Sequence, residues 1–357
     1  MKVLAIVQAW NSADSIRGFI VRWMEELSDR VDQLIVLTLE QEEPPSRPNI
    51  RVFSLDKGQL PRLGRRWRYL FRWHRLMPQL LSDYHPDVIF THMSPILSVL
   101  AAPYARPRRI PIVTWYAHRQ VTTILRVAHH WSDKMVASAG TSYRYKHDKL
   151  VVVGQGVDTD FFSPDGTRVE GRLLLLSVAR LSPIKDPLTL IGAVDRLCGR
   201  GHPLCCAFVG DAPERDRAYA RMVRERARHL ELDGTIQFVG AVPNAQVVSW
   251  YRRSFAHINL CPTGALDKAV LEAMACGKPS FVANEGFQDT LGRWADALLF
   301  RHGDVDDLAS KIEGLLVMEE AKRQQMSVEL RQSVVNRHSL EGLADRLIVL
   351  FQEVQRQ

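Results

Sequence analysis

The chain has 357 residues, of which 46% are hydrophobic and 24% are charged, and this composition excludes a disordered or fibrous protein. One hydrophobic core rarely serves so long a chain, so we expect two domains. The net charge of +7 lies entirely in residues 1–160, which hold 22 Lys and Arg against 15 Asp and Glu. This asymmetry indicates an anionic partner for the first half: a membrane surface, a phosphorylated lipid or a nucleic acid.

The cysteines and the apolar runs narrow the class of protein further. The number of cysteines is odd, and they are Cys198, Cys205, Cys206, Cys261 and Cys276. Because no Cys-x-x-Cys pair occurs, neither a zinc site of standard spacing nor a disulfide framework is expected. No apolar run is long enough for a signal-peptide core or a membrane-spanning helix, so we expect a cytoplasmic protein.

The first half alternates short apolar runs with amphipathic stretches. Strands are expected at residues 3–7, 33–39, 50–53, 88–91, 112–115 and 134–138. Helices are expected between them at residues 16–27, 60–81, 96–104 and 121–130. Such alternation predicts a doubly wound α/β domain with a parallel sheet.

Residues 60–81 form a basic and aromatic stretch. Six arginines interleave there with large apolar side chains: Arg62, Arg65, Arg66, Arg68, Arg72 and Arg75 with Trp67, Tyr69, Leu70, Phe71 and Trp73. No acidic residue lies between Asp56 and Asp83. One interpretation is a helix at the interface of an anionic bilayer. The other is an ordinary amphipathic helix with solvated arginines and buried aromatics. A nucleic-acid partner is not expected, because no recognised binding motif accompanies the charge.

Candidates for the acceptor or membrane side come from this half of the chain. They are Arg65, Arg66, Trp67 and Arg72, together with His92 at the end of the strand at 88–91. We expect the protein to sit peripherally on the inner face of the cell membrane if the basic stretch contacts lipid.

Glycines, prolines and other turn-forming residues gather at 154–166 and mark a domain boundary. We place the linker at about residues 158–172. The expected domains are therefore residues 1–160 and residues 161–338. A last helix within residues 339–357 is a candidate for packing back on the first domain.

The second half repeats the alternation. Strands are expected at residues 172–179, 204–209, 236–239, 257–260 and 279–282. Helices are expected at residues 186–198, 214–229, 244–253, 268–276, 305–317 and 319–336. This half is therefore predicted to be a second Rossmann-like domain.

Two cations follow the first strand of the second half. Arg180 and Lys185 lie in a loop between a buried strand, which ends at residue 179, and a helix. Ligands of open α/β sheets bind at the carboxyl ends of the strands. A guanidinium, an ammonium and a helix N-terminus together suit a diphosphate. The alternative is a surface loop with two solvated cations.

A second polar segment spans residues 262–279. A loop that contains Gly264 opens a short helix, and Glu272 lies inside that helix among apolar neighbours that include Val270 and Leu271. A carboxylate in such surroundings needs hydrogen-bond donors. The two hydroxyls of a ribose are suitable donors. The alternative is a helix residue that reaches solvent or a backbone amide.

These two segments resemble the donor-site motifs of retaining glycosyltransferase family 4, which has the GT-B fold. The resemblance covers residues 150–355 well and the first half in outline. It implies two Rossmann-like domains that face a central cleft. It also implies that Arg180 and Lys185 bind the donor diphosphate, that Glu272 holds the ribose, and that Val242 lies near the base. Further candidates for donor binding are Gly264, Asp267, Lys268, Val270 and Leu271.

The chain departs from the family pattern at two places. Gly264 stands where the family usually has a glutamate that contacts the donor sugar. Asp267 and Lys268 are expected to take over part of that role. The family's glycine-rich loop after the first strand is missing, so any anion bound there must use Asn11, Ser12 and other donors.

By the same resemblance, the chain is a retaining and metal-independent transferase, with no cofactor besides its nucleotide-sugar substrate. The catalytic residues are then His118, Arg180 and Lys185, with His118 as a hydrogen-bond donor or an orienter of the acceptor hydroxyl. A structural role for this lone histidine is the alternative. The expected acceptor is a glycan or lipid-linked molecule of cell-envelope polysaccharide or glycolipid synthesis. A nucleotide-sugar epimerase, a sugar phosphorylase and a catalytically silent binding subunit remain open alternatives.

Overall fold

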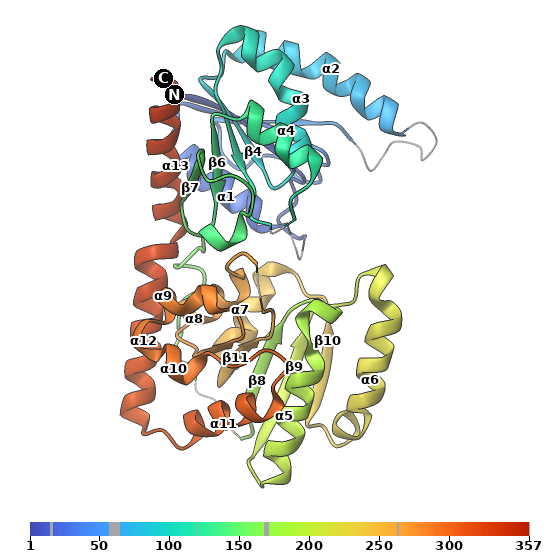
Figure 1. The fold of residues 1–357 in the computed structure, drawn as a ribbon, viewed down its shortest axis with the longest axis vertical. Helices are drawn as coiled ribbons and strands as arrows, with labels where there is room; N and C mark the ends of the chain where they lie inside the picture. Colours follow the sequence, from blue (N-terminus) through green and yellow to red (C-terminus); the bar gives the residue numbers. More distant parts are fainter. Residues whose placement is uncertain (15–16, 57–64, 119, 168–170, 263, 357) are drawn as a thin grey trace. The chain divides into compact units, whose positions relative to one another are not determined.

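The computed structural model describes residues 1–14, 17–56, 65–118, 120–167, 171–262 and 264–356, with only the backbone of residues 65 and 66. The chain divides into two compact units (Figure 1). The first unit comprises Met1–Gly156 and Leu340–Gln357, and the second unit comprises Val157–Ser339.

The first unit is built on a seven-stranded sheet in the order β3-β2-β1-β4-β5-β6-β7. The strands are β1 (Lys2–Val7), β2 (Gln33–Thr38), β3 (Ile50–Ser54), β4 (Val88–His92), β5 (Ile112–Trp115), β6 (Lys134–Ala137) and β7 (Leu150–Val152). All neighbouring strands in this sheet pair in parallel. Their apolar side chains are buried on both faces, as expected for a parallel sheet covered by helices. β7 was not predicted, because its short apolar run directly precedes the turn-rich segment that begins at residue 154.

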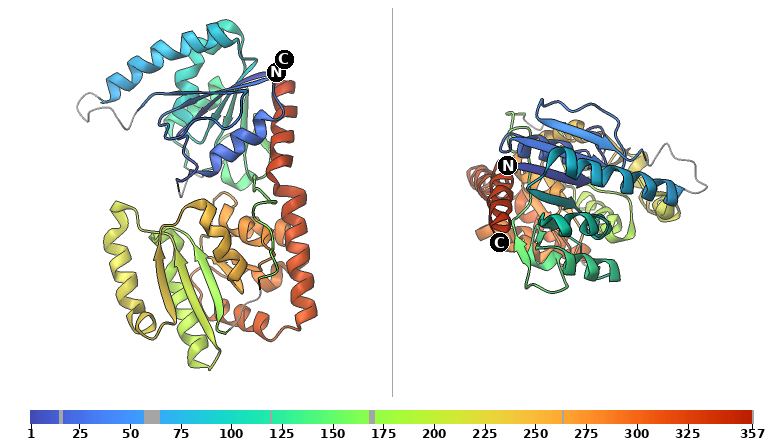
Figure 2. Two further views of the ribbon diagram at one scale, coloured as in Figure 1. Left: turned by 180° about the vertical axis from the view of Figure 1, so that it is seen from behind. Right: turned by 90° about the horizontal axis from the view of Figure 1, so that it is seen from above.

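Five longer helices belong to the first unit (Figures 1 and 2). They are α1 (Phe19–Ser28), α2 (Arg65–Tyr84), α3 (Pro95–Ala105), α4 (Thr123–Trp131) and α13 (Leu340–Gln355). α2 continues through Pro78 and ends three residues later than predicted. Its predicted start at residue 60, with Arg62, lies outside the described residues, as do residues 15 and 16 before α1.

The last helix, α13, packs on α1 within the first unit. Arg30 pairs with Asp345, with 2.5 Å between Nε and Oδ1. The Trp23 indole donates a 3.1 Å hydrogen bond to the carbonyl of Gly156. A Cβ at Gly156 would lie 2.6 Å from a methyl carbon of Leu343, so a larger residue here would require the Leu343 side chain to move.

The second unit holds a five-stranded parallel sheet in the order β10-β9-β8-β11-β12. Its strands are β8 (Leu173–Val178), β9 (Leu204–Val209), β10 (Ile236–Gly240), β11 (Ala256–Asn259) and β12 (Ser280–Val282). The strand order reverses between β8 and β11. Two doubly wound α/β units are thus confirmed.

Helices cover this second sheet (Figure 1). The longer ones are α5 (Pro187–Gly199), α6 (Arg217–Leu232), α7 (Asn244–Arg253), α8 (Lys268–Ala275), α11 (Val305–Leu316) and α12 (Glu320–His338). The one-turn helices α9 (Gln288–Leu291) and α10 (Ala295–Leu298) are too short for a periodic pattern and were not predicted. Among the described residues, no helix combines the length and the apolar character needed to cross a membrane.

The segment predicted as the linker, residues 158–172, belongs to the second unit, and the chain passes between the units at Gly156 and Ser339 instead. Its described part is held by arginines of that unit. Arg252 of α7 donates to the carbonyl of Ser163 at 2.8 Å, and Arg331 of α12 donates to that of Phe162 at 3.2 Å. These bonds explain why a stretch rich in turn residues is part of a packed unit.

Candidate functional site

The reversal of strand order in the second unit brings two loops together. β8 and β11 are neighbours, so the loop after Val178 and the loop after Asn259 leave the sheet at the same carboxyl edge. In open α/β sheets this is the usual place for a ligand. We call the side chains at this edge the sheet-edge site. Its members are Arg180, Lys185, Asn244, Tyr251, Asn259, Asp267, Lys268 and Glu272.

The first of these loops is fixed by a close backbone approach. The amide of Ala179 donates to the carbonyl of Val209 at 3.0 Å. Gly210 has φ +136°, and a Cβ there would lie 2.1 Å from the Ala179 oxygen. Only glycine fits this position. The loop after Ala179 continues with Arg180, whose side chain is exposed. A turn of 3-10 helix over Pro183–Lys185 then leads into α5.

Lys185 is joined to the second loop by an ion pair. Its ammonium donates to Asp267, and the amide of Asn259 donates to the same carboxylate at 2.9 Å. Burial works to lower the pKa of Lys185, but Asp267 raises it above its usual value. Burial likewise works to raise the pKa of Asp267, but Lys185 and Asn259 hold it below its usual value. Both groups are therefore charged at neutral pH.

Arg180 lies near enough to Lys185 to act on its charge. Both cations come from one loop, as the sequence predicted for a diphosphate site. Arg180 is exposed, whereas Lys185 is largely covered. The pair thus presents one open guanidinium beside an ammonium that is already held in place.

Glu272 is buried inside α8, with 7% of its surface exposed. Its Oε2 accepts a 3.0 Å hydrogen bond from the Tyr251 hydroxyl, and the Asn244 side chain donates to it as well. Burial raises the pKa of Glu272, although Lys268 and these two donors oppose the shift. A carboxylate accepts up to about four hydrogen bonds, so this one can take further donors from a ligand.

Lys268 stands one helical turn before Glu272. Its Nζ is buried, and burial lowers the pKa of Lys268 well below its usual value, while Glu272 acts in the opposite direction. Val270 and Leu271, which were also predicted to bind the donor, are fully buried. Their side chains pack in the interior and shape the helix that carries Glu272.

Gly264 and Val242 border the same edge. Gly264 has φ +119°, a backbone conformation that other residues rarely adopt, and open space surrounds the position of a Cβ. A glutamate at this position would therefore strain the loop. Val242 is half-buried and lies two residues before Asn244, whose side chain reaches Glu272.

Several residues of this edge were not predicted from sequence. Tyr251 and Asn244 sit on α7 and Asn259 ends β11, where each looks like an ordinary helix or strand residue. His257 on β11 is fully buried, and neither of its ring nitrogens has a hydrogen-bond partner among the described residues. Its ring lies 5.8 Å from that of Tyr251 in an edge-to-face arrangement. Burial lowers the pKa of His257 to about 4.

The remaining candidates belong to the first unit. His92 ends β4 and is buried among aromatic rings, 5.5 Å from Trp23 and 5.9 Å from Trp115. His118 is exposed, and its Nδ1 accepts a 3.1 Å hydrogen bond from the amide of Gln120.

The basic stretch of the first unit lies on α2. Trp67 is exposed, and Arg72 pairs with Asp56. The side chains of Arg65 and Arg66 lie outside the described residues. The described residues contain no group of three or more His, Cys, Asp or Glu that could hold a metal ion.

Comparison with solved structures identifies the architecture. A glycosyltransferase from Rickettsia africae aligns with a TM-score of 0.78 at 16% identity, over 99% of this chain and 98% of that one. The Anabaena protein HepE, solved in complex with UDP-glucose, aligns with a TM-score of 0.76 at 17% identity, over 99% and 100% of the two chains. At such identities the likeness shows the fold alone, and it confirms the predicted GT-B fold class.

Comparison with curated proteins reaches only part of the chain. A D-inositol 3-phosphate glycosyltransferase from Kribbella flavida is 29% identical over 198 residues, which is 52% of this chain and 46% of that protein. A component of the phosphatidylinositol N-acetylglucosaminyltransferase from Arabidopsis thaliana is 25% identical over 189 residues, 52% and 40% of the two. The chain thus matches less than half the length of either relative.

The family model described as glycosyl transferases group 1 matches residues 158–332. This range contains every member of the sheet-edge site, including the cation pair, Asp267 and Glu272. The chain is thus similar to the glycosyl transferases group 1 family over residues 158–332, just under half of its length.

Proposed function

We propose that this chain is a retaining glycosyltransferase that moves a sugar from a nucleotide diphosphate sugar to a glycan or a lipid-linked acceptor. The observation that carries the proposal is the ion pair between Lys185 and Asp267. It joins the loop of the two cations to the start of the helix that holds Glu272. A diphosphate site and a ribose site thereby share one sheet edge.

The two cations suit the diphosphate of the donor. Charge develops on the departing phosphate when the bond to the sugar breaks, and fixed cations stabilise it. Arg180 offers a planar fork of N–H groups and Lys185 a point charge. Because two protein cations supply this charge, we propose that the reaction needs no metal ion.

Glu272 suits the ribose. Its buried carboxylate is held from one side by Tyr251 and Asn244. Hydroxyl donors of a sugar would satisfy its remaining acceptor capacity. Val242, close in sequence to Asn244, is proposed to border the base.

The proposed transfer takes place on one face of the sugar. The bond between the anomeric carbon and the diphosphate oxygen breaks, and a bond from the acceptor oxygen forms on the same face. The acceptor proton passes to the departing phosphate oxygen. The two carboxylates of the sheet-edge site are engaged, Asp267 by Lys185 and Glu272 by Tyr251, so neither is assigned as the nucleophile. His118 of the first unit is proposed to orient the acceptor.

The substrates are proposed from the relatives. HepE was solved with UDP and UDP-glucose, which favours a uridine diphosphate sugar as donor. The names of the curated relatives point to acceptors that carry phosphate, such as inositol phosphates and a phosphatidylinositol. The positive charge of residues 1–160 suits such an acceptor. We place the reaction in the synthesis of a cell-envelope polysaccharide or glycolipid, at the cytoplasmic side of a membrane.

Calorimetry with UDP-, GDP-, ADP- and dTDP-sugars tests the donor site. We expect one nucleotide class to bind and Arg180→Ala to weaken that binding at least tenfold. Arg228→Ala is the matched control, because Arg228 is an exposed arginine on α6 of the same unit. Absence of binding by any nucleotide diphosphate would refute the proposal.

Product analysis tests the reaction. Nuclear magnetic resonance of the product should show the anomeric configuration of the donor, and turnover should persist in a metal chelator. Hydrolysis or phosphorolysis of the donor without transfer would instead favour a phosphorylase or an epimerase-like enzyme. Donor binding without any turnover would favour a silent subunit.

A further inference from the structure

Helix α2 of the first unit has two halves with different surroundings. Its C-terminal half is anchored, because Trp73, Met77, Leu80 and Leu81 are buried in the core cluster that covers β1 and β2. The Trp73 indole also donates a 3.1 Å hydrogen bond to the carbonyl of Leu100. In the described part of its N-terminal half, Tyr69 packs against the same cluster, whereas Trp67 and Phe71 are exposed. The C-terminal half thus anchors α2 to the first unit (Figure 1).

Two large aromatic side chains stand on the N-terminal half. Trp67 is 78% exposed and Phe71 is 71% exposed. They lie four residues apart and therefore on the same face of the helix. Exposure of such rings to water is unfavourable, whereas the boundary between headgroups and acyl chains of a bilayer favours Trp and Phe.

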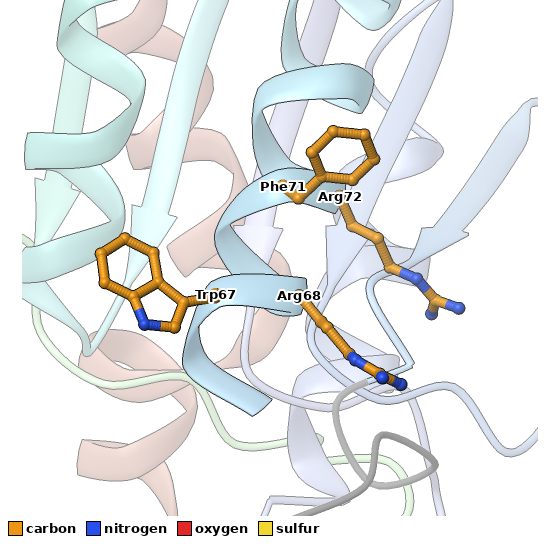
Figure 3. A pocket seen from close by; sticks show the side chains of 4 residues that line it. All are labelled: Trp67, Arg68, Phe71 and Arg72. Carbon is orange, nitrogen blue, oxygen red and sulfur yellow. The ribbon is translucent and has the colours of Figure 1, made fainter. Parts of the chain in front are cut away.

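Cations flank these rings. In Figure 3, Arg68 and Arg72 extend from successive turns on one side of α2, with Phe71 near Arg72, and Trp67 projects to the other side. The four side chains line an open recess of about 410 Å³. Arg75 continues the positive face and is also exposed. The first acidic residue of the helix is Asp83, near its end.

The pattern favours lipid over the other occupants. A second copy of the chain would bring one arginine-rich face against another and meet repulsion. An ordinary solvent-exposed helix face would account for the arginines, but it would not account for the exposure of two large aromatic rings. In a recess with both groups, the guanidinium of Arg68 can bind a lipid phosphate while the rings enter the acyl boundary. Arg72 is paired with Asp56 and adds to the surface beside it.

We propose that Trp67, Arg68, Phe71, Arg72 and Arg75 form a docking surface for an anionic lipid bilayer. We call this set the α2 surface. The inference goes beyond the proposed transfer reaction and does not require it. Docking there would hold the first unit at the membrane where a lipid-linked acceptor resides.

Co-sedimentation with vesicles tests the proposal. We compare phosphatidylcholine vesicles with vesicles that contain about 30% phosphatidylglycerol, a fraction that gives an anionic surface. Wild-type protein should bind the anionic vesicles, and binding should fall as salt rises. Trp67→Ser/Phe71→Ser and Arg68→Gln/Arg75→Gln should each lower the partition coefficient by roughly tenfold.

Matched variants elsewhere serve as controls. Leu232→Ser/Val328→Ser removes two apolar side chains with 80% and 67% exposure, and Arg226→Gln/Arg228→Gln removes two exposed arginines of α6. Both should bind vesicles like wild type. All variants should keep wild-type affinity for the nucleotide, so failure of docking and failure of the proposed function are distinguishable.

Three results would overturn the inference. The first is a wild-type protein that does not bind anionic vesicles. The second is equal binding by wild type and both α2 variants. The third is that the α2 surface serves another partner. Its side chains would then be needed for self-association, or for binding of single-stranded RNA that is tighter than binding of vesicles at equal salt.

Discussion

The carboxylate of Asp267 binds both the ammonium of Lys185 and the amide of Asn259, the latter at 2.9 Å. Lys185 and Asp267 are 82 residues apart in the chain. This contact fixes a long flexible side chain at the place where the donor diphosphate is proposed to bind. An ammonium has three N–H donors, so the bond to Asp267 leaves two for phosphate oxygens.

Removing the charge of Asp267 should destabilise the second unit. Asp267→Asn leaves a largely covered ammonium without its counter-charge, so we expect the free energy of unfolding to fall by roughly 1–3 kcal/mol. Urea unfolding measures the change. Glu225→Gln, which removes one partner of an exposed pair with Arg228 on α6, is the control and should change stability by less than about 0.5 kcal/mol.

A double-mutant cycle separates this contact from a general effect. If the pair is coupled as its geometry indicates, Lys185→Met/Asp267→Asn costs less than the sum of the two single changes. Additive losses in unfolding free energy would show that the two groups act independently.

We expect the Glu272 carboxylate to accept hydrogen bonds from the ribose hydroxyls of the nucleotide. We expect Glu272→Gln to weaken nucleotide binding by roughly 10- to 100-fold, because charge-assisted hydrogen bonds are the strong ones. Wild-type protein should also prefer a nucleotide over its 2′-deoxy or 3′-deoxy analogue by roughly tenfold. Calorimetry with these ligands measures both effects.

The preference for the hydroxylated nucleotide distinguishes a loss of ribose recognition from damage to the fold. Glu272→Gln should lose the preference for the hydroxylated nucleotide, since the preference resides in that carboxylate. Tyr251→Phe keeps the carboxylate and should keep the preference. A Glu272→Gln protein that still discriminates against the deoxy analogue would place the ribose elsewhere.

Local patterns predicted most of the fold and the charged part of the site. Strands such as β1 and β8 are near-continuous apolar runs, and Arg180 and Lys185 follow one of them directly. Asn259, Tyr251 and His257 escaped prediction. The positions of Asn259 and His257 depend on the pairing of β8 with β11, and that of Tyr251 depends on the packing of α7 against α8, so no local pattern reveals them. The same holds for Asp267, whose partner is set by the pairing of two distant loops.

Gly264 offers a test of backbone strain without any change in packing. Its φ is +119° and nothing lies within 4 Å of a Cβ at this position. Gly264→Ala should therefore lower the free energy of unfolding by roughly 1–2 kcal/mol through conformation alone. Gly314→Ala, in the exposed part of α11, is the control and should raise it by roughly 0.5–1 kcal/mol. Equal signs for the two changes in urea unfolding would contradict the strained loop.

His257 should make the second unit sensitive to acid. Its pKa is lowered to about 4 by burial, whereas the unfolded chain binds a proton near pH 6.5. Between these values the unfolded state holds more protons, so stability falls as the pH falls from about 6.5 to about 4. The shift corresponds to a loss of about 3 kcal/mol over that window.

His257→Phe isolates this contribution from the carboxylates that titrate in the same range. The substitution removes no hydrogen bond, because neither ring nitrogen of His257 has a partner among the described residues. The free energy of unfolding near pH 7 should therefore stay the same or rise. At pH 5 the variant should be more stable than wild type, and its unfolding free energy should depend less on pH. The exposed His130→Gln is the control and should keep the wild-type slope. Parallel pH curves for wild type and His257→Phe in urea unfolding would show that the folded protein takes up a proton on His257 as readily as the unfolded chain does.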